Sequence, residues 1–335
     1  MKTRRPEERL RDILRGFMQS QCLAVAVELG VADRLAGGPH TAEELAAATG
    51  THPDALRRLL RALVSIELLC EVASGRFLLA PLGELLRGDA EASLREEIRQ
   101  ALHPTSWASW GALGESVRTG RPSFPALFGT DAWSWRARHP EAGATFDAMA
   151  ERNSRRAAES LCEHLDFAGV RCLVDVGGGS GGLLSEILVR RPELCGILLD
   201  RPGVVAAAPA LLAAADVAER CRVEGGDFLS AVPPGGDLYL LRGVLHDWDD
   251  AAAATILRNC RHAMSPTARL VLVESLLERE PPPAVALLDL HMLVIHGGRE
   301  RTAGEFRALL AASGFRLKSI RRSDDGATLV EGTPS

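Results

Sequence analysis

The sequence predicts an α/β protein in which a doubly wound, mostly parallel sheet follows a mostly helical domain with a winged-helix pattern. Three observations lead to this prediction. The chain has 335 residues, which exceeds the usual size of a single domain. From Arg9 to about Ala101 the apolar residues have helical spacing. From Arg171 onward, strand-like and helix-like segments alternate, which requires a sheet covered by helices on both faces.

The amino-terminal segment has the order helix, turn, helix and hairpin. Thr41 and Glu44 form a capping box that opens a short helix. Residues 49–53 contain Gly and Pro and predict a turn, and residues 54–63 predict a second helix. A Ser-Gly pair at residues 74–75 then separates two short strand-like pieces. This order predicts a winged helix.

A winged helix is also typical of DNA-binding proteins, so the charge of the segment matters. Residues 41–70 contain three arginines and four acidic residues, a net charge of −1, whereas a DNA-reading helix normally lies on a basic face. The whole chain has 39 basic and 44 acidic residues, and its charge of −5 gives no general attraction to nucleic acid or to an anionic membrane. We therefore interpret the domain as a dimerisation or packing module, and we expect no nucleic-acid partner and no membrane partner.

Aromatic residues gather between the two halves of the chain, over residues 103–146. Core packing explains most such residues, but a wall of an apolar pocket for a flat ligand is the alternative. The aromatic residues concerned are Trp107, Trp110, Phe124, Phe128, Trp133 and Trp135. A long helix is expected over residues 141–164. The predicted parts are thus a winged-helix domain at 1–105, a helical connector and cap at 106–165, and the α/β domain at 166–335.

Apolar runs in the second half predict the strands of the sheet. A glycine-rich loop follows the first run, and a helix through Arg190 ends before Pro192. The last two runs have the spacing of a hairpin. The predicted strands are 172–176, 196–200, 221–224, 237–241, 269–274, 315–321 and 327–331. Ligands of such sheets bind at the carboxyl ends of the strands.

The glycine-rich loop fits a nucleoside cofactor. Gly177, Gly179 and Gly182 have the spacing G-x-G-x-x-G directly after the first strand. Asp200 ends the second strand, 23 residues beyond Gly177, where an acid can bind the two hydroxyls of a ribose. NAD and S-adenosylmethionine both carry an adenosine ribose, so the loop by itself leaves both open.

Six motifs in one order favour S-adenosylmethionine. They are Val174-Asp-Val-Gly-Gly-Gly-Ser-Gly181, Leu199-Asp-Arg-Pro202, Gly225-Gly-Asp-Phe228, Leu245-His-Asp-Trp248, Val273-Glu274 and Gly297-Gly-Arg-Glu-Arg-Thr302. The set resembles the S-adenosylmethionine-dependent O-methyltransferases of the plant caffeic acid and flavonoid type and their bacterial relatives in natural-product tailoring. The resemblance is dense from Leu173 to Phe315 and looser before Met149, and it implies a Rossmann-like methyltransferase sheet and a homodimer.

The resemblance also implies which residues bind S-adenosyl-L-methionine. Gly177 and Gly179 would lie beside the methionine part, and Asp200 would hold the ribose hydroxyls. Asp227 and Phe228 would frame the adenine. Arg242 stands where plant members usually carry lysine, and it would contribute to the same site.

Methyl transfer to a phenol needs a base, because a phenol with a pKa near 10 is mostly protonated at neutral pH. A histidine with a pKa near 6.5 is mostly neutral and can accept that proton. His246 follows the strand at 237–241, and the resemblance implies that it is the catalytic base. The resemblance places two acids, Glu274 and Glu300, beside it to orient the ring. The alternative for Glu300 is an acid that leads into a helix.

The resemblance implies that Asp289, Met292 and His296, on a predicted helix at 287–296, line the site of an aromatic small-molecule acceptor. Met292 is otherwise an ordinary core residue. We expect no metal site, on the ground that no cluster of carboxylates accompanies the histidine. The seven cysteines contain no CxxC pair, which also argues against zinc.

Composition excludes several chemistries. The chain has two lysines, Lys2 and Lys318, and one tyrosine, Tyr239, so a lysine Schiff base and the Tyr/Lys pair of many NAD-dependent dehydrogenases have almost no candidates. An odd number of cysteines fits a reducing compartment, and the charged start of the chain lacks the apolar stretch of a signal peptide. We expect a cytoplasmic enzyme.

The sequence thus predicts an O-methyltransferase that methylates a phenolic hydroxyl of an aromatic secondary metabolite by in-line displacement. Three alternatives stay open at this stage. A relative that binds the cofactor could instead hydroxylate or decarboxylate polyketides, the winged helix could belong to a DNA-binding regulator, and the glycine loop could bind NAD.

Overall fold

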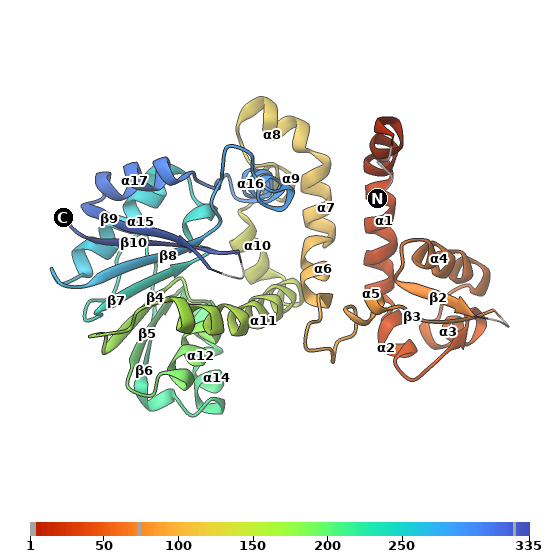
Figure 1. Cartoon of the computed structure of the whole chain (residues 1–335), viewed down its shortest axis with the longest axis horizontal. Coiled ribbons are helices and arrows are strands. Elements are labelled where there is room, and N and C mark those ends of the chain that lie inside the picture. The colour runs from red at the N-terminus through yellow and green to blue at the C-terminus, as the bar shows by residue number, and fades with distance from the viewer. Residues whose placement is uncertain (1–4, 73–74, 324–325) are drawn as a thin grey trace. The chain divides into compact units, whose positions relative to one another are not determined.

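The computed structural model describes residues 5–72, 75–323 and 326–335, and the chain divides into two compact units, residues 1–107 and 108–335 (Figure 1). The fold class predicted from the sequence is confirmed: one unit is mostly helical, and the other contains a seven-stranded sheet.

The amino-terminal unit contains helices around a small antiparallel sheet with the strand order β1-β3-β2. Its elements are α1 (Pro6–Glu28), α2 (Val31–Leu35), β1 (His40–Thr41), α3 (Ala42–Thr49), α4 (Pro53–Ser65), β2 (Leu69–Val72), β3 (Arg76–Leu79), α5 (Pro81–Glu84) and α6 (Arg95–Ala101). Helix α7 (Pro104–Gly111) continues into the second unit.

The winged-helix pattern forms as predicted. The Thr41 hydroxyl accepts the amide of Glu44, and the Glu44 carboxylate accepts the amide of Thr41, so the capping box starts α3. Leu45, Leu60 and Phe77 pack in the buried core of this unit. Ser74, predicted to lie in the hairpin turn between β2 and β3, is outside the described residues.

Helix α1 leaves a row of large apolar side chains exposed. They repeat at the i, i+3, i+4 spacing of one helix face. The row consists of Leu10, Ile13, Leu14, Phe17 and Met18, each at least 53% exposed. The fully buried residues of α1 are Ala26 and Val27, which lie near its carboxyl end. Most of the helix therefore contributes little to the core of its own unit.

The second unit begins with helices and continues as an alternation of strands and helices. Its helices are α8 (Leu113–Thr119), α9 (Ser123–Phe128), α10 (Ala132–Arg138), α11 (Pro140–His164), α12 (Gly182–Arg190), α13 (Pro202–Val205), α14 (Ala208–Ala214), α15 (Asp250–Ala263), α16 (Pro283–Ile295) and α17 (Ala303–Ala312). Its strands are β4 (Cys172–Val176), β5 (Cys195–Asp200), β6 (Cys221–Gly225), β7 (Leu238–Arg242), β8 (Arg269–Glu274), β9 (Phe315–Arg322) and β10 (Thr328–Pro334). Two short 3₁₀ turns lie at Ala218–Arg220 and Leu245–Asp247.

The sheet has the strand order β6-β5-β4-β7-β8-β10-β9. Strands β4 to β8 pair in parallel, and β10 pairs antiparallel with both β8 and β9, as the predicted hairpin requires. Alternate residues of each strand enter two separate cores. Leu173 and Leu240 face α11, α12 and α14, whereas Val174 and Leu241 face α15 and α17. Figure 1 shows these two helical layers on opposite sides of the sheet.

Several element boundaries differ from the predicted ones. The helix expected at 287–296 is α16, which begins at Pro283 and ends at Ile295. Pro283 occupies its first position, where the missing amide costs nothing. The strand expected at 237–241 starts and ends one residue later. No helix of the described residues combines the length and the apolar character needed to cross a membrane.

Candidate active site

The carboxyl ends of β4, β5, β7 and β8 bring most of the predicted site residues to one edge of the sheet, because these strands are neighbours and run parallel. The glycine-rich loop follows β4. Gly177 and Gly179 have φ of +74° and +64°, in the left-handed region that favours glycine. The amide of Gly177 donates to the carbonyl of Leu199 on β5 at 2.8 Å, which ties the loop to the neighbouring strand.

Asp200 lies at the end of β5 and contacts the same loop. Its Oδ2 accepts the amide of Gly179 at 2.9 Å, and its Oδ1 accepts the amide of Arg201 at 2.7 Å. Burial raises the pKa of this carboxyl, and the two backbone hydrogen bonds work in the opposite direction. Each oxygen retains a lone pair for a hydroxyl donor. A Cβ added at Gly179 would meet no atom within 4 Å, so there is room beside the loop.

The remaining predicted cofactor residues are Phe228, Asp227 and Arg242, and of these Phe228 comes near the glycine-rich loop. A Cβ added at Gly177 would lie 3.4 Å from the Phe228 ring, so Phe228 closes over the loop. Asp227 turns one oxygen to the amide of Leu229 at 2.8 Å. Arg242 ends β7. Burial raises the pKa of Asp175 on the neighbouring strand β4 to about 7, and the charge of Arg242 opposes this rise only in part.

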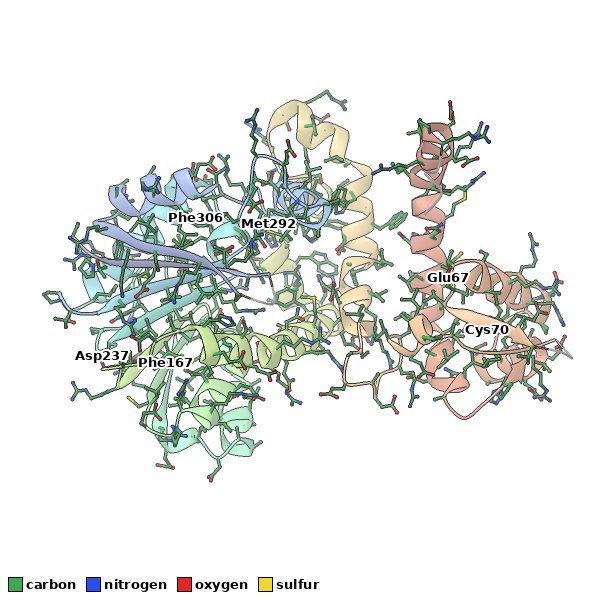
Figure 2. The ribbon with its side chains drawn as sticks, in the orientation of Figure 1. Glu67, Cys70, Phe167, Asp237, Met292 and Phe306 are labelled. Carbon is green, nitrogen blue, oxygen red and sulfur yellow. The ribbon has the colours of Figure 1, made fainter. Side chains whose placement is uncertain are left out.

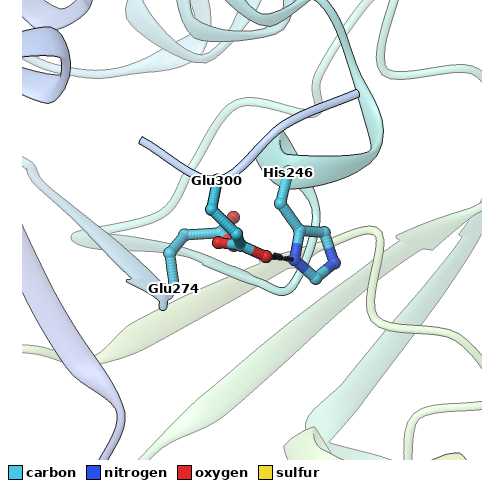
Figure 3. Close-up of side chains that lie close together, drawn as sticks. All are labelled: His246, Glu274 and Glu300. Atoms are coloured by element: carbon cyan, nitrogen blue, oxygen red, sulfur yellow. Dashed lines mark hydrogen bonds and ion pairs between the residues drawn. The ribbon is translucent and has the colours of Figure 1, made fainter. Parts of the chain in front are cut away.

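His246, Glu274 and Glu300 form a compact cluster (Figure 3). His246 lies in the 3₁₀ turn after β7, Glu274 ends β8, and Glu300 follows α16. The imidazole Nδ1 is 2.8 Å from Oε1 of Glu300 and 3.7 Å from Oε2 of Glu274. The other ring nitrogen, Nε2, points away from both carboxylates (Figure 3). Its surroundings include Oδ1 of Asp247 at 3.8 Å.

Glu274 also holds the backbone that carries the histidine. Its Oε1 accepts the amides of Val244 and Leu245 at 3.1 and 2.8 Å. Oε2 of Glu274 and Oε2 of Glu300 are buried and have no hydrogen-bond partner among the described residues. Two buried carboxylates therefore depend on one imidazole for most of their charge compensation.

This arrangement makes the imidazole strongly basic. Burial lowers the pKa of His246, but the charges of Glu274 and Asp247 and the hydrogen bond to Glu300 outweigh it and raise the pKa to about 10. Burial raises the pKa of Glu274 to about 6. The raised pKa departs from the expectation of a mostly neutral histidine at neutral pH, because the carboxylates favour the protonated imidazole, whose Nδ1 can donate to Glu300.

The ground given for expecting no metal is also wrong. One possible ligand atom from each of His246, Glu274 and Glu300 lies within 4.8 Å of the others, so carboxylates do accompany the histidine. Nδ1 of His246 is engaged with Glu300, and one oxygen of Glu274 is engaged with two backbone amides. Removal of metals with a chelator is the direct test of whether activity needs one.

The basicity of His246 leads to a prediction for its titration. We expect the imidazole resonances of the ligand-free wild type to titrate with a midpoint near pH 10. Because Glu300→Gln removes one negative charge that favours the imidazolium, its midpoint should lie lower by about 1–3 pH units. NMR of ¹⁵N-histidine-labelled protein measures both values, and the exposed Glu278→Gln serves as the matched control.

The raised pKa of His246 also makes the free energy of unfolding depend on pH. Between pH 6.5 and about 10 the folded wild type binds a proton at His246 that the unfolded chain has lost. The free energy of unfolding should therefore fall as the pH rises through this interval, and less steeply in Glu300→Gln. A wild-type midpoint near 6.5 would contradict the electrostatic role of both carboxylates.

The three predicted acceptor residues lie on or beside α16. Met292 is buried at 5% exposure and is labelled in Figure 2. His296 stacks on Trp133 with the ring centroids 5.0 Å apart, and its Nε2 is 3.5 Å from Oδ1 of Asp247. Asp289 accepts the amide of Glu300 at 2.8 Å, so one of its oxygens is already engaged with the protein.

Sequence reasoning missed Arg301, which holds the turn that carries His246. Arg301 is 1% exposed, and its guanidinium donates to the carbonyls of Leu245 and Trp248 at 2.7 and 2.8 Å and to Asp250. Arg301 belongs to the motif at residues 297–302, but only the fold shows that its side chain contacts the turn at residues 245–248. The same holds for Gly298, where a Cβ would lie 2.0 Å from the carbonyl oxygen of His246.

It also missed side chains that surround the acceptor residues. The indole of Trp110 donates to Nδ1 of His291 at 3.0 Å, and burial lowers the pKa of His291 to about 4, so this histidine is neutral. Asp247 lies between His246 and His296. The aromatic residues at 103–146 were a signal for this wall, since Trp110 and Trp133 both contact histidines of the α16 segment.

Comparisons with known proteins agree with the geometry. A model of the O-methyltransferase domain matches residues 110–316, and a model of the O-methyltransferase dimerisation domain matches residues 11–88. The phenazine O-methyltransferase of Lysobacter antibioticus is 41% identical over 97% of this chain and 95% of its own length. An 8-amino-8-demethylriboflavin N,N-dimethyltransferase of Streptomyces davaonensis is 39% identical over 92% of this chain and 90% of its own.

Among solved structures, the chain is similar to an O-methyltransferase from neocarzinostatin biosynthesis. That protein was crystallised with S-adenosylmethionine and 2-hydroxy-5-methyl naphthoic acid. The TM-score is 0.83 at 34% identity, over 94% of this chain and 96% of that one.

Proposed function

The chain belongs to the O-methyltransferase family that carries an amino-terminal dimerisation domain, and from this membership we propose that it methylates a phenolic hydroxyl of an aromatic small molecule, with His246 as the general base. It is an S-adenosylmethionine-dependent methyltransferase. The observation that carries the proposal is the hydrogen bond of His246 to a buried carboxylate, at the same edge of the sheet as a glycine loop and an acid suited to a ribose.

The loop and its neighbours fit the cofactor. Gly179 has open space beside it, and Asp200 has lone pairs directed by two backbone amides. We assign Gly177 and Gly179 to the methionine part, Asp200 to the ribose hydroxyls, and Asp227, Phe228 and Arg242 to the rest of this site. When bound, the cofactor supplies a methyl group on a positively charged sulfur, which is already a good leaving group.

His246 removes the proton of the acceptor hydroxyl. The neutral imidazole accepts this proton at Nε2, while the Glu300 carboxylate fixes Nδ1–H and stabilises the imidazolium that forms. The nearby carboxylates raise the pKa of His246, which strengthens it as a base toward a phenol. The rate should rise toward alkaline pH, because the neutral form of His246 becomes more abundant.

Residues 106–165 form the cap over the acceptor in this proposal; in the sequence they follow the winged-helix domain at 1–105 and precede the methyltransferase domain at 166–335. Met292, His296 and Asp289 line the acceptor site from the side of α16. The stack of Trp133 on His296 supports a site for a flat aromatic ring.

Transfer of a labelled methyl group tests the proposal. The purified chain is incubated with methyl-labelled S-adenosylmethionine and a panel of phenols, hydroxynaphthoquinones, hydroxyphenazines and hydroxylated polyketides, each with its amino counterpart. We expect label on hydroxyl members and full activity after chelator treatment. Label on amines alone would contradict O-methylation, and loss of activity with a chelator would contradict the metal-free mechanism.

The exposed row on α1 supports a homodimer. A single-residue change such as Leu14→Glu places a charge in the middle of this row, and we expect it to convert the dimer into monomers, because an apolar interface does not tolerate an unpaired charge. Analytical ultracentrifugation measures the change. Asp12→Lys, also on α1, is the charge-change control, and a dimer that persists in Leu14→Glu would show that another surface joins the subunits.

A further inference from the structure

Arg136 of α10 is a partly buried cation that no carboxylate of the described residues pairs with. Its Nη1 is buried and has no hydrogen-bond partner among those residues. Its guanidinium lies 4.8 Å from the ring centroid of Trp133 and 4.3 Å from that of Phe146. These two rings meet edge to face with their centroids 5.4 Å apart, so the cation lies beside both of them, with at least one donor unused.

An unused donor at Nη1 is costly, because a buried N–H without a hydrogen bond has lost its water and the aromatic contacts of the guanidinium do not replace that bond. Burial lowers the pKa of Arg136 to about 10, and the charges of Asp247 and Asp147 only partly oppose this effect. Arg201 lies on the same Trp133 ring at 5.5 Å and adds positive charge nearby. The surroundings thus favour an anion in hydrogen-bond contact with Nη1 of Arg136, a contact that no described residue makes.

Arg136 is connected to the reacting end of the site through stacked and charged groups. Trp133 lies against both Arg136 and His296. His296 reaches Oδ1 of Asp247 at 3.5 Å, and the same oxygen is 3.8 Å from Nε2 of His246. An aromatic ring of the acceptor that lies along Trp133 and His296 can direct one substituent to Nε2 of His246 and another to Arg136.

We propose that Arg136 binds the carboxylate of the acceptor, and that the acceptor is therefore an aromatic hydroxy acid. The inference rests on the proposed function for the identity of the acceptor. The planar guanidinium can donate two parallel hydrogen bonds to a carboxylate, and the adjoining Trp133 and Phe146 rings shield the pair from water. Arg136 is then a specificity-determining residue that distinguishes acids from neutral phenols.

A carboxylate also occurs in the methionine part of the cofactor, so the experiment separates the two sources. Calorimetry measures binding of a hydroxynaphthoate and of the naphthol that lacks only its carboxylate, to protein saturated with S-adenosylhomocysteine. Hydroxybenzoate with phenol, and a hydroxyphenazine carboxylate with its hydroxyphenazine, extend the comparison to other ring sizes. A separate titration measures binding of S-adenosylhomocysteine alone.

In the wild type we expect the acid of at least one pair to bind about 10- to 100-fold more tightly than its neutral partner. Arg136→Met should remove this preference by weakening binding of the acid, while the neutral partner and S-adenosylhomocysteine change less than about threefold. Arg136→Lys should keep part of the preference for the acid, because lysine keeps the positive charge but lacks the two parallel N–H donors of the guanidinium. Arg138→Met, an exposed arginine on the same helix, should change nothing.

Equal binding of acid and neutral partner in every wild-type pair would overturn the proposal, and this comparison needs no variant to fold. Loss of S-adenosylhomocysteine binding in Arg136→Met, with acid binding kept, would assign Arg136 to the cofactor instead. Binding does not depend on turnover, so an Arg136-dependent preference for acids without methyl transfer would refute the proposed function and keep the anion site.

Discussion

Replacing His246 with alanine is expected to lower kcat by about 100- to 10,000-fold at pH 8, the range that a positioned general base contributes. The KM values for cofactor and acceptor should change little, because Nε2 acts on the proton of the hydroxyl and not on the bulk of either ligand. Steady-state kinetics with the acceptor identified in the labelling assay measures the effect.

An acceptor of greater acidity separates a base from a merely structural histidine. A nitrophenol that is already ionised at the assay pH needs no base, so His246→Ala should lose much less activity with it than with an ordinary phenol. His262→Ala, in the exposed last turn of α15, is the matched control. Unchanged activity in His246→Ala would instead favour the chemistry of relatives that hydroxylate or decarboxylate.

His246→Ala should also change the stability profile. The variant leaves Glu274 buried without the imidazolium, whose charge opposes the rise in the pKa of this carboxyl, so its protonated form is favoured further. The unfolding midpoint should therefore fall more steeply from pH 5 to pH 8 than in the wild type. Thermal unfolding at several pH values, followed by circular dichroism, gives this slope.

Replacing Arg301 with methionine is expected to destabilise the protein by about 3–5 kcal/mol and to abolish most activity. The variant removes the donors of two turn carbonyls, at Leu245 and Trp248, which stay buried beside an apolar side chain. The turn carries His246, so its imidazole loses the position set by the backbone. Denaturant unfolding measures the free energy, and kcat measures the loss of alignment.

Matched variants test whether the cause is the buried donor set. Arg299→Met removes a neighbouring arginine whose side chain is 46% exposed, and it should cost less than about 1 kcal/mol. Arg301→Lys keeps the charge but cannot reach both carbonyls and Asp250 together, so it should fall between the two. Wild-type stability in Arg301→Met would show that water replaces the guanidinium at the turn.

The sheet could be predicted closely because its strands are buried on both faces. Strands at 172–176 and 269–274 form with the predicted boundaries, since each is a short apolar run between loop residues. The start of α16 could not be predicted in this way. Its apolar spacing becomes clear only after Leu287, whereas its first turn depends on the fixed φ of Pro283. Site residues that end a strand, such as Asp200 and Glu274, could be predicted for the same reason.

What the sequence could not predict depends on contacts between distant segments. The His246 pKa depends on carboxylates 28 and 54 positions later, and no local pattern reports how closely they approach. Sequence reasoning assigned no role to Arg136, since no local pattern shows that its guanidinium contacts both Trp133 and Phe146. Asp289 was assigned to the acceptor, although the fold turns one of its oxygens to the amide of Glu300.

The strand order has a consequence for the way the protein is made. β10 lies between β8 and β9, although it follows both in the chain. A ribosome must therefore release residues up to Pro334 before β8 acquires its second neighbour, and until then the edge of β8 is open to pairing with another chain. We expect nascent chains that stall before Thr328 to need chaperones and to aggregate when these are absent.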